Sequence, residues 1–491
     1  MEEGHRLRRV LGPLQLTNLG VGAIVGAGIF VVTGLVAKDK AGPALMLSFV
    51  IAGFACAFAA LCYSEFASMV PVAGSAYTYA YATLGEFFAW VIGWDLILEY
   101  GVGAASVAHG WSHYFVDFLG IFGVKPPAAL INAPFDFNPV TGQFVSTGAL
   151  IDLPAFLISA AITVVLVLGI RQSAAFNAIM VAVKLSVVLL IIGVGAFYID
   201  PRNWQPFAPY GYSGISFFGH TILGQAGPAG EPLGVMAGAA IIFFAYIGFD
   251  AVSTHAEEAR NPSRDVPFGI IASLGLCTIL YIAVSAVLTG MVPYDKISID
   301  APLSHAFKVV GLPWLHFIIS LGALTGITSV LMVLLLSQPR IMLAMARDGL
   351  LPAKFFGAIH HRFRTPWKST LLTGMIVGLM GALMPLRVLA ELVNVGTLLA
   401  FIFVCAAVLI MRRIHPDAAR PFRCPLVPLV PALGIIFCLL LMFSLPWENW
   451  LRLLIWLLLG FAIYFAYGRH HSLLARNSVE KPALKSVQVE S

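Results

Sequence analysis

The sequence predicts an all-α protein that crosses a membrane about twelve times, each span taking about 20 apolar residues. Three observations support this fold class. Of the 491 residues, 59% are hydrophobic and 11% are charged, with a mean hydropathy of +0.90, whereas about 25% of an average soluble chain is charged. The apolar residues gather in segments long enough to span a bilayer. Interruptions then recur in the first and sixth of these segments, and the first of them is glycine-rich.

The predicted spans form one membrane domain. We expect them at residues 14–36, 43–68, 85–115, 152–170, 174–198, 235–256, 267–291, 311–336, 368–386, 389–411, 427–445 and 450–468. Residues 1–13 precede the spans, and residues 469–491 form a polar tail. Most of the 29 Lys and Arg residues fall in loops on the side of the N-terminus. Because cytoplasmic loops are enriched in these residues, we expect both termini in the cytoplasm and the protein in the cell membrane.

The first interruption is the run Gly22–Phe30 (GAIVGAGIF) inside the first predicted span. Each glycine weakens a helix by about 1 kcal/mol relative to alanine. Irregular backbone at membrane depth is tolerated only where protein or a polar cavity surrounds it. Two interpretations stay open: the glycines let helices pack closely, or the helix breaks here to bind a ligand.

The second interruption, Phe243–Asp250 (FFAYIGFD), lies in the sixth predicted span. Paired interruptions at corresponding positions indicate a transporter built from inverted repeats. With five spans in each repeat, the second repeat crosses the membrane in the opposite direction to the first. We expect the repeats at 14–198 and 235–411, with two appended spans at 427–468.

The two breaks predict a binding site for the backbone of an α-amino acid. A helix that starts after the first break has free N–H groups and attracts a carboxylate. We expect these carboxylate contacts from Ile24, Gly26, Ala27 and Gly28. A helix that ends at the second break has free carbonyl groups that suit an ammonium group, and we expect these from Phe244, Ala245 and Ile247. The alternative is that both breaks only kink their helices.

Lys184 lies about ten residues into the fifth predicted span, hence about 15 Å deep at 1.5 Å per residue. Ionisable residues at such depth are functional candidates by default, and a buried lysine can exchange its proton at physiological pH. Lys184 is therefore a candidate for proton coupling. The alternative is a permanently charged, structural lysine that caps the carbonyls of the first span and the hydroxyl groups of Thr325, Thr328 and Ser329.

Three more residues lie deep in predicted spans. Glu99, one turn after Asp95, binds the side chain of a cationic substrate, takes part in a proton route, or pairs with a polar neighbour. Asp250 begins the inner half of the sixth span, where a carboxylate caps free N–H groups. Tyr246 is a candidate steric gate, with packing as the alternative.

The sequence indicates neither an enzyme nor a cofactor. It contains no GxSxG, HExxH or Walker motif. His109 and His113 have a metal-capable spacing, but no acid or third histidine completes a site around them, so we expect no metal. The net charge of +5 is spread over loops, which argues against binding nucleic acid.

Four motifs in this order resemble the amino acid–polyamine–organocation superfamily: Gly22–Phe30, Phe243–Asp250, Glu257–Asp265 (EEARNPSRD) and Gly326–Ser329 (GITS). From about residue 11 to 468, the chain is most similar to bacterial relatives of the cationic amino acid transporters. The resemblance implies the five-plus-five fold of the leucine transporter. It also implies that Lys184 occupies the place of a sodium ion in sodium-coupled relatives.

We therefore expect proton-coupled uptake of an L-amino acid by alternating access, with Glu99 pointing to cationic substrates. One alternative is a sodium-independent exchanger or facilitator for neutral amino acids. An alternative of another class is a membrane protein that senses amino acids without net transport. Beyond substrate and protons, the expected partner is the lipid bilayer. Small membrane proteins can also pack on lipid-facing helices, and the sequence offers no test of such a partner.

Overall fold

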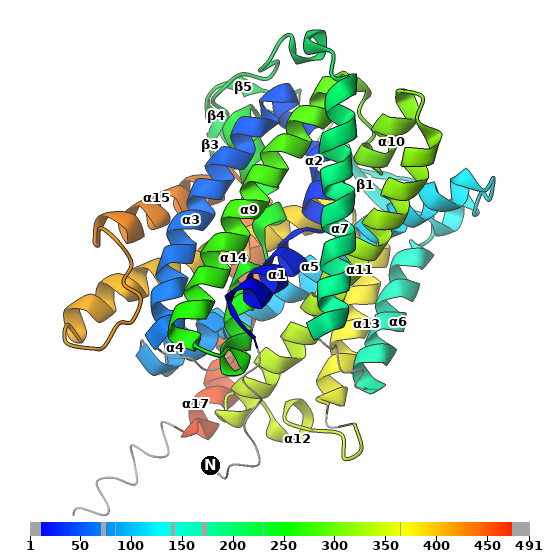
Figure 1. Ribbon diagram of the computed structural model, residues 1–491. Helices are drawn as coiled ribbons and strands as arrows, with labels where there is room; N and C mark the ends of the chain where they lie inside the picture. Colours follow the sequence, from blue (N-terminus) through cyan, green and yellow to red (C-terminus); the bar gives the residue numbers. More distant parts are fainter. Residues whose placement is uncertain are drawn as a thin grey trace, which may run out of the picture.

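The computed structural model describes residues 11–69, 75–83, 85–138, 143–168, 174–228, 230–363 and 365–473. Helices make up most of this part of the chain, and many run along a shared direction (Figure 1). The longest unbroken ones are α3 (Leu45–Met69), α5 (Glu86–Ile121), α6 (Leu153–Leu168), α7 (Ala174–Gly195), α9 (Pro262–Met291), α11 (Pro313–Arg347), α13 (Trp367–Leu383), α14 (Leu386–Ile414), α15 (Leu429–Phe443) and α16 (Trp447–Ile463). Shorter helices are α4 (Ser75–Thr83), α10 (Pro302–Val309), α12 (Ala353–Phe356) and α17 (Arg469–His471). The predicted end segments, 1–13 and 469–491, lie largely outside the described residues.

Two of the predicted spans are broken helices. The first consists of α1 (Pro13–Ile24), the π-helix η2 (Gly28–Val32), α2 (Thr33–Val36) and the π-helix η3 (Ala37–Ala41). The second consists of α8 (Val235–Ile242) and the 3-10 helices η8 (Phe243–Tyr246) and η9 (Phe249–Glu258). Both interruptions therefore fall where the glycine-rich runs predict them. Other single turns are η4 (Gly42–Ala44), η5 (Ala128–Leu130), η6 (Ala196–Tyr198), η7 (Pro201–Trp204), η10 (Tyr294–Lys296) and η11 (Tyr464–Gly468).

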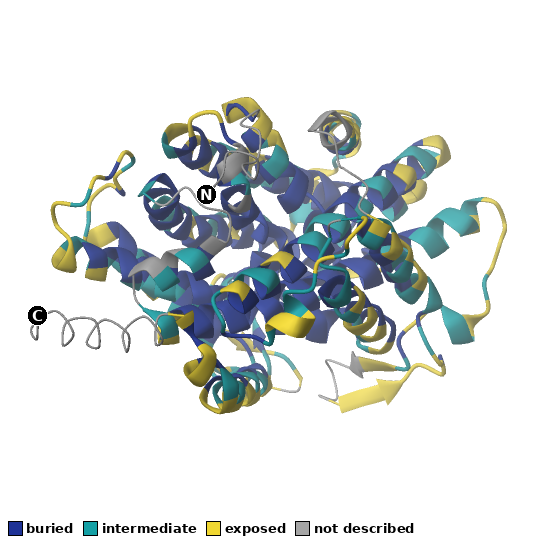
Figure 2. Ribbon diagram, turned by 90° about the horizontal axis from the view of Figure 1, so that it is seen from below, coloured by how far each residue is buried: buried dark blue, intermediate teal, exposed yellow. Residues whose placement is uncertain are grey.

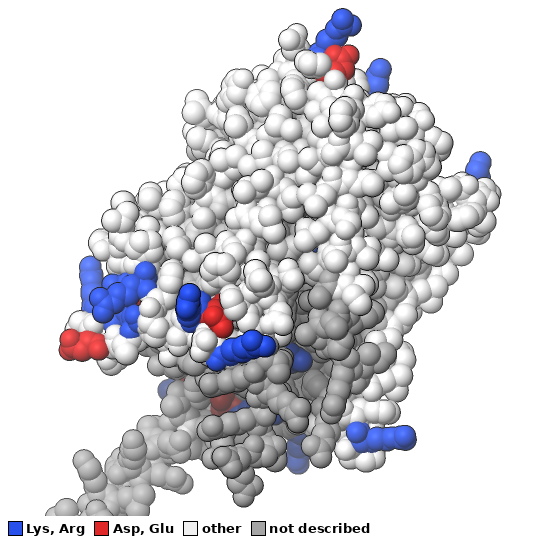
Figure 3. Space-filling view, in the orientation of Figure 1, with Lys and Arg blue, Asp and Glu red and all other residues white. Residues whose placement is uncertain are grey.

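The chain is an all-α, multi-pass membrane protein, as the composition predicts. Among the described residues, eight helical segments are long and apolar enough to cross a membrane, and α6, α13 and α15 are shorter apolar helices. Figure 3 shows charged side chains near the two ends of one face and a broad band between them with almost none. Such a band is what a hydrocarbon layer requires, because a charge there is costly.

Several helices extend past the predicted span ends. α5 continues to Ile121 instead of residue 115, and α11 continues to Arg347 instead of residue 336. Hydropathy marks where the bilayer ends, but a helix satisfies its own backbone and can continue into water. The boundaries of the two inverted repeats stay a prediction.

Loops predicted without regular structure contain three short antiparallel hairpins. β1 (Phe135–Asn138) pairs with β2 (Gln143–Ser146), and β3 (Ile215–Phe217) pairs with β4 (His220–Leu223). In the stretch 224–234, β5 (Gln225–Ala226) pairs with β6 (Pro232–Leu233). The hairpins β3–β4 and β5–β6 lie at one end of the molecule, at the top of Figure 1.

The two breaks lie in the interior, among the long helices. Buried residues fill the middle of the molecule, and exposed residues line its rim and its loops (Figure 2). α1 packs against α7, α9 and α11, and η2 packs against η8. α15 and α16 present many exposed aliphatic side chains at the flank, such as Leu454 and Leu458, as a lipid-facing surface requires.

Candidate functional site

The break in the first span leaves backbone donors free. α1 ends at Ile24, Val25 is extended, and η2 begins at Gly28. The N–H groups of residues 29 and 30 both donate to the carbonyl of Gly26, at 3.2 Å. Within the described part of the chain, no acceptor faces the N–H groups of Gly26, Ala27 and Gly28. The N–H groups of Gly26, Ala27 and Gly28 are therefore free, whereas Ile24, also expected in the site, is the last residue of α1. That these donors hold a carboxylate stays a prediction.

Lys184 of α7 lies directly against this break. Its Nζ donates to the carbonyl of Gly22, to the carbonyl of Val25 at 3.0 Å and to Ser329 Oγ at 3.0 Å. The Ser329 hydroxyl donates in turn to the carbonyl of Gly326 at 2.8 Å. Lys184 is fully buried. Its ammonium group therefore joins α7 and α11 to the last turn of α1.

Only one of the three hydroxyl groups predicted beside Lys184 contacts it. Ser329 does, whereas Thr325 Oγ1 donates to the carbonyl of Gly322 at 2.9 Å. Thr328 Oγ1 donates to the carbonyl of Leu324 at 2.7 Å and accepts from Trp111 Nε1 at 2.9 Å. Residues three and four apart share one face of a helix, so the sequence motif alone could not select among these three.

Two tyrosines that the sequence reasoning missed also bind carbonyls of the first span. Tyr281 of α9 donates to the carbonyl of Ile24 at 2.9 Å, and Tyr114 of α5 donates to the carbonyl of Phe30 at 2.7 Å. Both phenol groups are fully buried. Aromatic residues in apolar spans are usually packing residues, so the sequence contains no signal that distinguishes these two.

The break in the sixth predicted span leaves backbone acceptors free. η8 ends at Tyr246, and Gly248 has a φ of +113°, a conformation that favours glycine. The carbonyl of Phe244 accepts from the N–H of Ile247 at 3.3 Å. Among the described residues, the carbonyls of Ala245 and Ile247 receive no hydrogen bond. Two of the three predicted ammonium acceptors are therefore open, and the third is shared.

The two breaks contact each other through glycine. A Cβ atom on Gly28 would lie 2.3 Å from Ala245 Cα, and one on Gly248 would lie 2.9 Å from the carbonyl oxygen of Ala23. A Cβ on Gly26 would lie 2.6 Å from Val330 Cγ2. Close packing therefore requires these glycines, and the same packing brings free donors and free acceptors to one place. The packing and binding interpretations of the glycine runs are compatible.

Glu99 belongs to a buried acidic group. It lies near Asp95 and Asp250, and all three residues are 1% exposed. Asp250 is the second residue of η9 and accepts from the Tyr100 hydroxyl at 2.6 Å, so its role as a capping carboxylate stays a prediction. Within the described residues, the carboxylate oxygens of Asp95 and Glu99 make no hydrogen bond. The hydroxyl of Thr397, beside Glu99, donates instead to the carbonyl of residue 393.

Tyr246, the predicted gate, is anchored away from the break. Its hydroxyl donates to the carbonyl of Phe49 in α3 at 2.8 Å. Its ring lies edge-on to the Phe49 ring at 6.2 Å and tilted against the Tyr281 ring at 5.6 Å. Tyr246 is fully buried. These contacts favour the packing interpretation of Tyr246.

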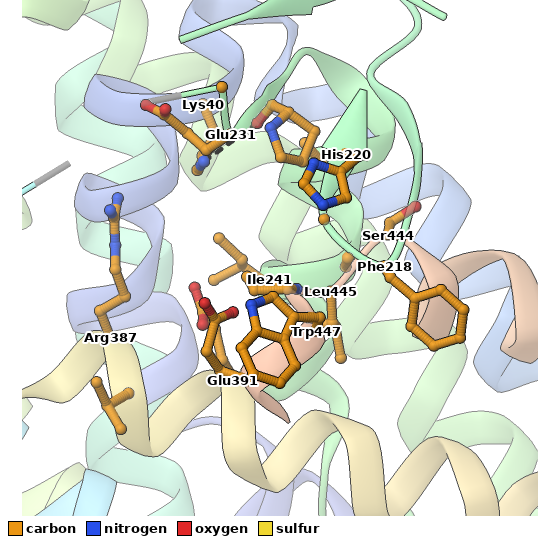
Figure 4. A pocket seen from close by; sticks show the side chains of 18 of the residues that line it. Lys40, Phe218, His220, Glu231, Ile241, Arg387, Glu391, Ser444, Leu445 and Trp447 are labelled. Carbon is orange, nitrogen blue, oxygen red and sulfur yellow. Dashed lines mark hydrogen bonds between the residues drawn. The ribbon is translucent and has the colours of Figure 1, made fainter. Parts of the chain in front are cut away.

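A cavity of about 310 Å³ lies above the second break, between α8, α14 and the segment before α16 (Figure 4). Charges of both signs line it, including Lys40, Arg387 and Glu391. Arg387 forms an ion pair with Asp39 at 2.9 Å. In the sequence, Arg387 and Glu391 stand one helical turn apart. The predicted span boundary at residue 389 separates them, so the sequence did not indicate that they line one cavity.

Asn394 connects that cavity to the broken helix. Its Nδ2 donates to the carbonyls of Ala240 at 2.7 Å and Ile241 at 3.0 Å, which line the cavity floor. The structure places Asn394 as a link between α14 and the last turn of α8, just before Phe243.

Comparisons with known proteins cover almost the whole chain. A family model described as amino acid permease matches residues 11–462. The chain is 48% identical over 469 residues to the branched-chain amino acid permease BcaP of Bacillus subtilis, and covers 95% of each chain. It is 46% identical to the methylthioribose transporter of the same organism, again over 95% of each chain. It is 33% identical to the vacuolar cationic amino acid transporter 4 of Arabidopsis thaliana, over 98% of this chain and 95% of the relative.

Proposed function

Since the chain belongs to the amino acid permease family, we propose that it takes up an L-amino acid together with protons by alternating access. Amino acid transport by a multi-pass membrane protein is the activity that the family and the relatives support. Proton coupling and the choice of substrate go further. The observation that carries proton coupling is the contact between Lys184 and the break in the first span.

The substrate backbone would lie between the two breaks. The free N–H groups of residues 26–28 would hold the carboxylate, since a helix N-terminus attracts an anion. The free carbonyls of Ala245 and Ile247 would hold the ammonium group. This arrangement serves any L-amino acid and rejects compounds that lack either charged end.

Proton coupling would follow from the number of donors on Lys184. Its ammonium group has three N–H donors, and three acceptors surround it: Gly22, Val25 and Ser329. A neutral amine has two N–H donors, so one acceptor would lose its partner at a cost of about 1–3 kcal/mol. The geometry of the first break therefore depends on the protonation state of Lys184. The same ammonium group would repel a sodium ion.

The second part of the proposal concerns which kind of side chain the substrate carries. Unpartnered carboxylates at Glu99 and Asp95 support a cationic side chain. The name of one relative, the branched-chain amino acid permease BcaP at 48% identity, supports a neutral one instead. We propose Glu99 as the deciding residue. With a cationic substrate, Glu99→Gln would weaken binding at least tenfold, and with a neutral substrate it would leave affinity within about twofold.

Uptake into proteoliposomes tests the transport proposal. Purified protein would be screened against all twenty amino acids by thermal shift, and the stabilising ones tested for uptake. We expect accumulation driven by an imposed proton gradient without sodium. Accumulation driven by a sodium gradient alone would refute proton coupling, and equilibration without accumulation would indicate a facilitator. Ligand binding without any flux would indicate a sensor.

We also propose that the protein lies in the cell membrane with both termini in the cytoplasm, and that a small membrane protein packs on α15 and α16. The six cysteines are all buried, so introduced cysteines report topology with low background. In intact cells, an impermeant maleimide should label Ser146→Cys in β2 and spare Ser486→Cys in the tail. The opposite pattern would invert the topology. Co-purification of a small membrane protein, lost when Leu454 and Leu458 become Trp, would test the partner.

A further inference from the structure

We propose that His109, His113 and Asp152 form a binding site for a divalent transition metal ion such as Zn²⁺. We expected no metal at these histidines because no acid or third histidine completes a site around them. That reason does not hold, because the fold brings Asp152, at the start of α6, against α5. One ligand atom from each of the three residues lies within 4.8 Å of the others.

The two histidines lie on the same face of α5. They are four residues apart, and their ring centroids are 4.5 Å apart. His109 Nδ1 lies 3.0 Å from Asp152 Oδ2 and 3.1 Å from the carbonyl of Gly381. Two imidazoles and a carboxylate are a common ligand set for zinc, which keeps a fourth position for water or a further ligand.

Asp152 is oriented by its neighbours. Its Oδ1 accepts from the Ser112 hydroxyl at 2.5 Å and from the N–H of Ala155 at 3.2 Å. These two bonds leave Oδ2 directed at His109, the arrangement by which outer partners fix a ligating carboxylate. Asp152 is fully buried. Its orientation therefore depends on the fold and not on an ion.

The side chain of His113 gives the main evidence for a ligand. Among the described residues, neither of its ring nitrogens has a hydrogen-bond partner, although both are buried. Buried polar atoms nearly always have a partner in the protein or in an ordered ligand. The nearest charge is the carboxylate of Asp300, with Oδ1 at 3.3 Å from Nδ1. A metal ion would give His113 a ligand partner.

A cavity of about 200 Å³ gives access to His113. Asn132, Asp300 and His305 line it together with His113 and Asp117. Asp117 is not available as a ligand, because its Oδ2 already accepts from Ser304, His316 and Ser320, each at 2.8 Å. Asp300 is available, since its side chain is 72% exposed at the mouth of the cavity. It is the candidate for the fourth ligand.

The position of this site connects it to transport. Asp300 precedes α10, and α10 packs against η2 and α2, which continue the first span beyond its break. An ion held by His113 and Asp300 would link α5 and α6 to that segment. Because alternating access requires such segments to move, we expect Zn²⁺ bound here to slow transport.

Direct metal binding tests the proposal. Full-length protein, purified in detergent with a tag free of histidine, would be titrated with Zn²⁺ alone by calorimetry. Absorption spectra with Co²⁺ would report nitrogen ligands. His113→Gln is the main variant, because His113 is only partly buried. The control is the double variant His360→Ala/His361→Ala, which removes another pair of neighbouring histidines with stacked rings.

We expect one tight Zn²⁺ site in the wild type and in the control, and at least tenfold weaker binding in His113→Gln and in His109→Gln. Size-exclusion profiles without metal would verify that the variants fold. Equal Zn²⁺ affinity in the wild type and His113→Gln would overturn the proposal. So would binding that disappears in the control instead. Asp300→Asn should weaken binding less than His113→Gln, because its carboxylate lies at the edge of the site.

Discussion

The breaks in the first and sixth predicted spans differ in what holds them open. At the first break, side chains of other helices bind the carbonyls of α1: Lys184 binds Gly22 and Val25, and Tyr281 binds Ile24. At the second break, the chain turns at Gly248 through a backbone conformation with φ +113°. Side-chain contacts lie on either side of this turn: Asn394 binds carbonyls of α8 before it, and Tyr100 binds Asp250 after it.

This difference indicates that the two breaks have different roles in transport. A break held by an ionisable side chain can respond to protonation, whereas one held by a glycine conformation cannot. The first break is also the one that exposes donors for a carboxylate. We infer that the proton and the carboxylate of the substrate act on the same few residues, while the second break provides a fixed set of acceptors. Substitutions that affect one break and spare the other test this inference.

Lys184→Ala should have the largest effect. The carbonyls of Gly22 and Val25 would lose their partner, at a cost of about 1–3 kcal/mol for each buried acceptor. We expect a lower melting temperature and no accumulation driven by a proton gradient. The control is Ser186→Ala, an exposed residue on the same helix whose hydroxyl binds only its own helix. Full accumulation by Lys184→Ala would show that the lysine is structural.

Gly28→Ala should have the next largest effect, because it separates the two breaks. The added methyl group would lie 2.3 Å from Ala245 Cα, which is backbone and cannot rotate away. Overpacking of this kind costs about 1–3 kcal/mol. The matched control is Gly193→Ala in α7, where nothing lies within 4 Å of the added Cβ. There we expect a gain of up to about 1 kcal/mol in helix stability. Melting temperature and initial uptake rate are the measurements.

Two outcomes of the comparison between these alanine variants would change the interpretation of Gly28. If Gly28→Ala transports like Gly193→Ala, the breaks do not need their close approach, and the packing interpretation of Gly28 fails. If Gly28→Ala keeps its melting temperature but loses uptake, the methyl group occupies space that the substrate needs. Either result would separate packing from binding at this glycine.

Local sequence signals predicted the breaks and Lys184 well. Glycine runs weaken a helix wherever they occur, and depth in a span follows from counting residues at 1.5 Å each. Both arguments need no knowledge of which helices are neighbours. The same arithmetic placed Asp250 at the start of the inner half of its span, where η9 begins.

Contacts between distant segments were not predictable in this way. Asp152 lies 39 residues after His113 in the chain, and only the packing of α5 against α6 brings them together. The tyrosine that binds Ile24 looks like any other aromatic residue of an apolar span. Thr328 was expected beside Lys184, but its position on α11 directs its hydroxyl to Trp111 instead. In each case the missing information was the rotation of one helix relative to another.

The smallest and most specific test uses two buried tyrosines, one at each break. Tyr281 donates to the carbonyl of Ile24, and Tyr246 donates to the carbonyl of Phe49, outside both breaks. Each Tyr→Phe change removes one hydrogen bond of about 0.5–1.5 kcal/mol, so both variants should lose similar stability. Only Tyr281→Phe frees a carbonyl at the first break, and only this variant should change the KM for the substrate. Because the rings themselves stay in place, a difference between the variants reports the hydrogen bond alone. Equal KM values for the two variants, with equal losses of stability, would mean that the caps on the first break hold the fold together without affecting the substrate.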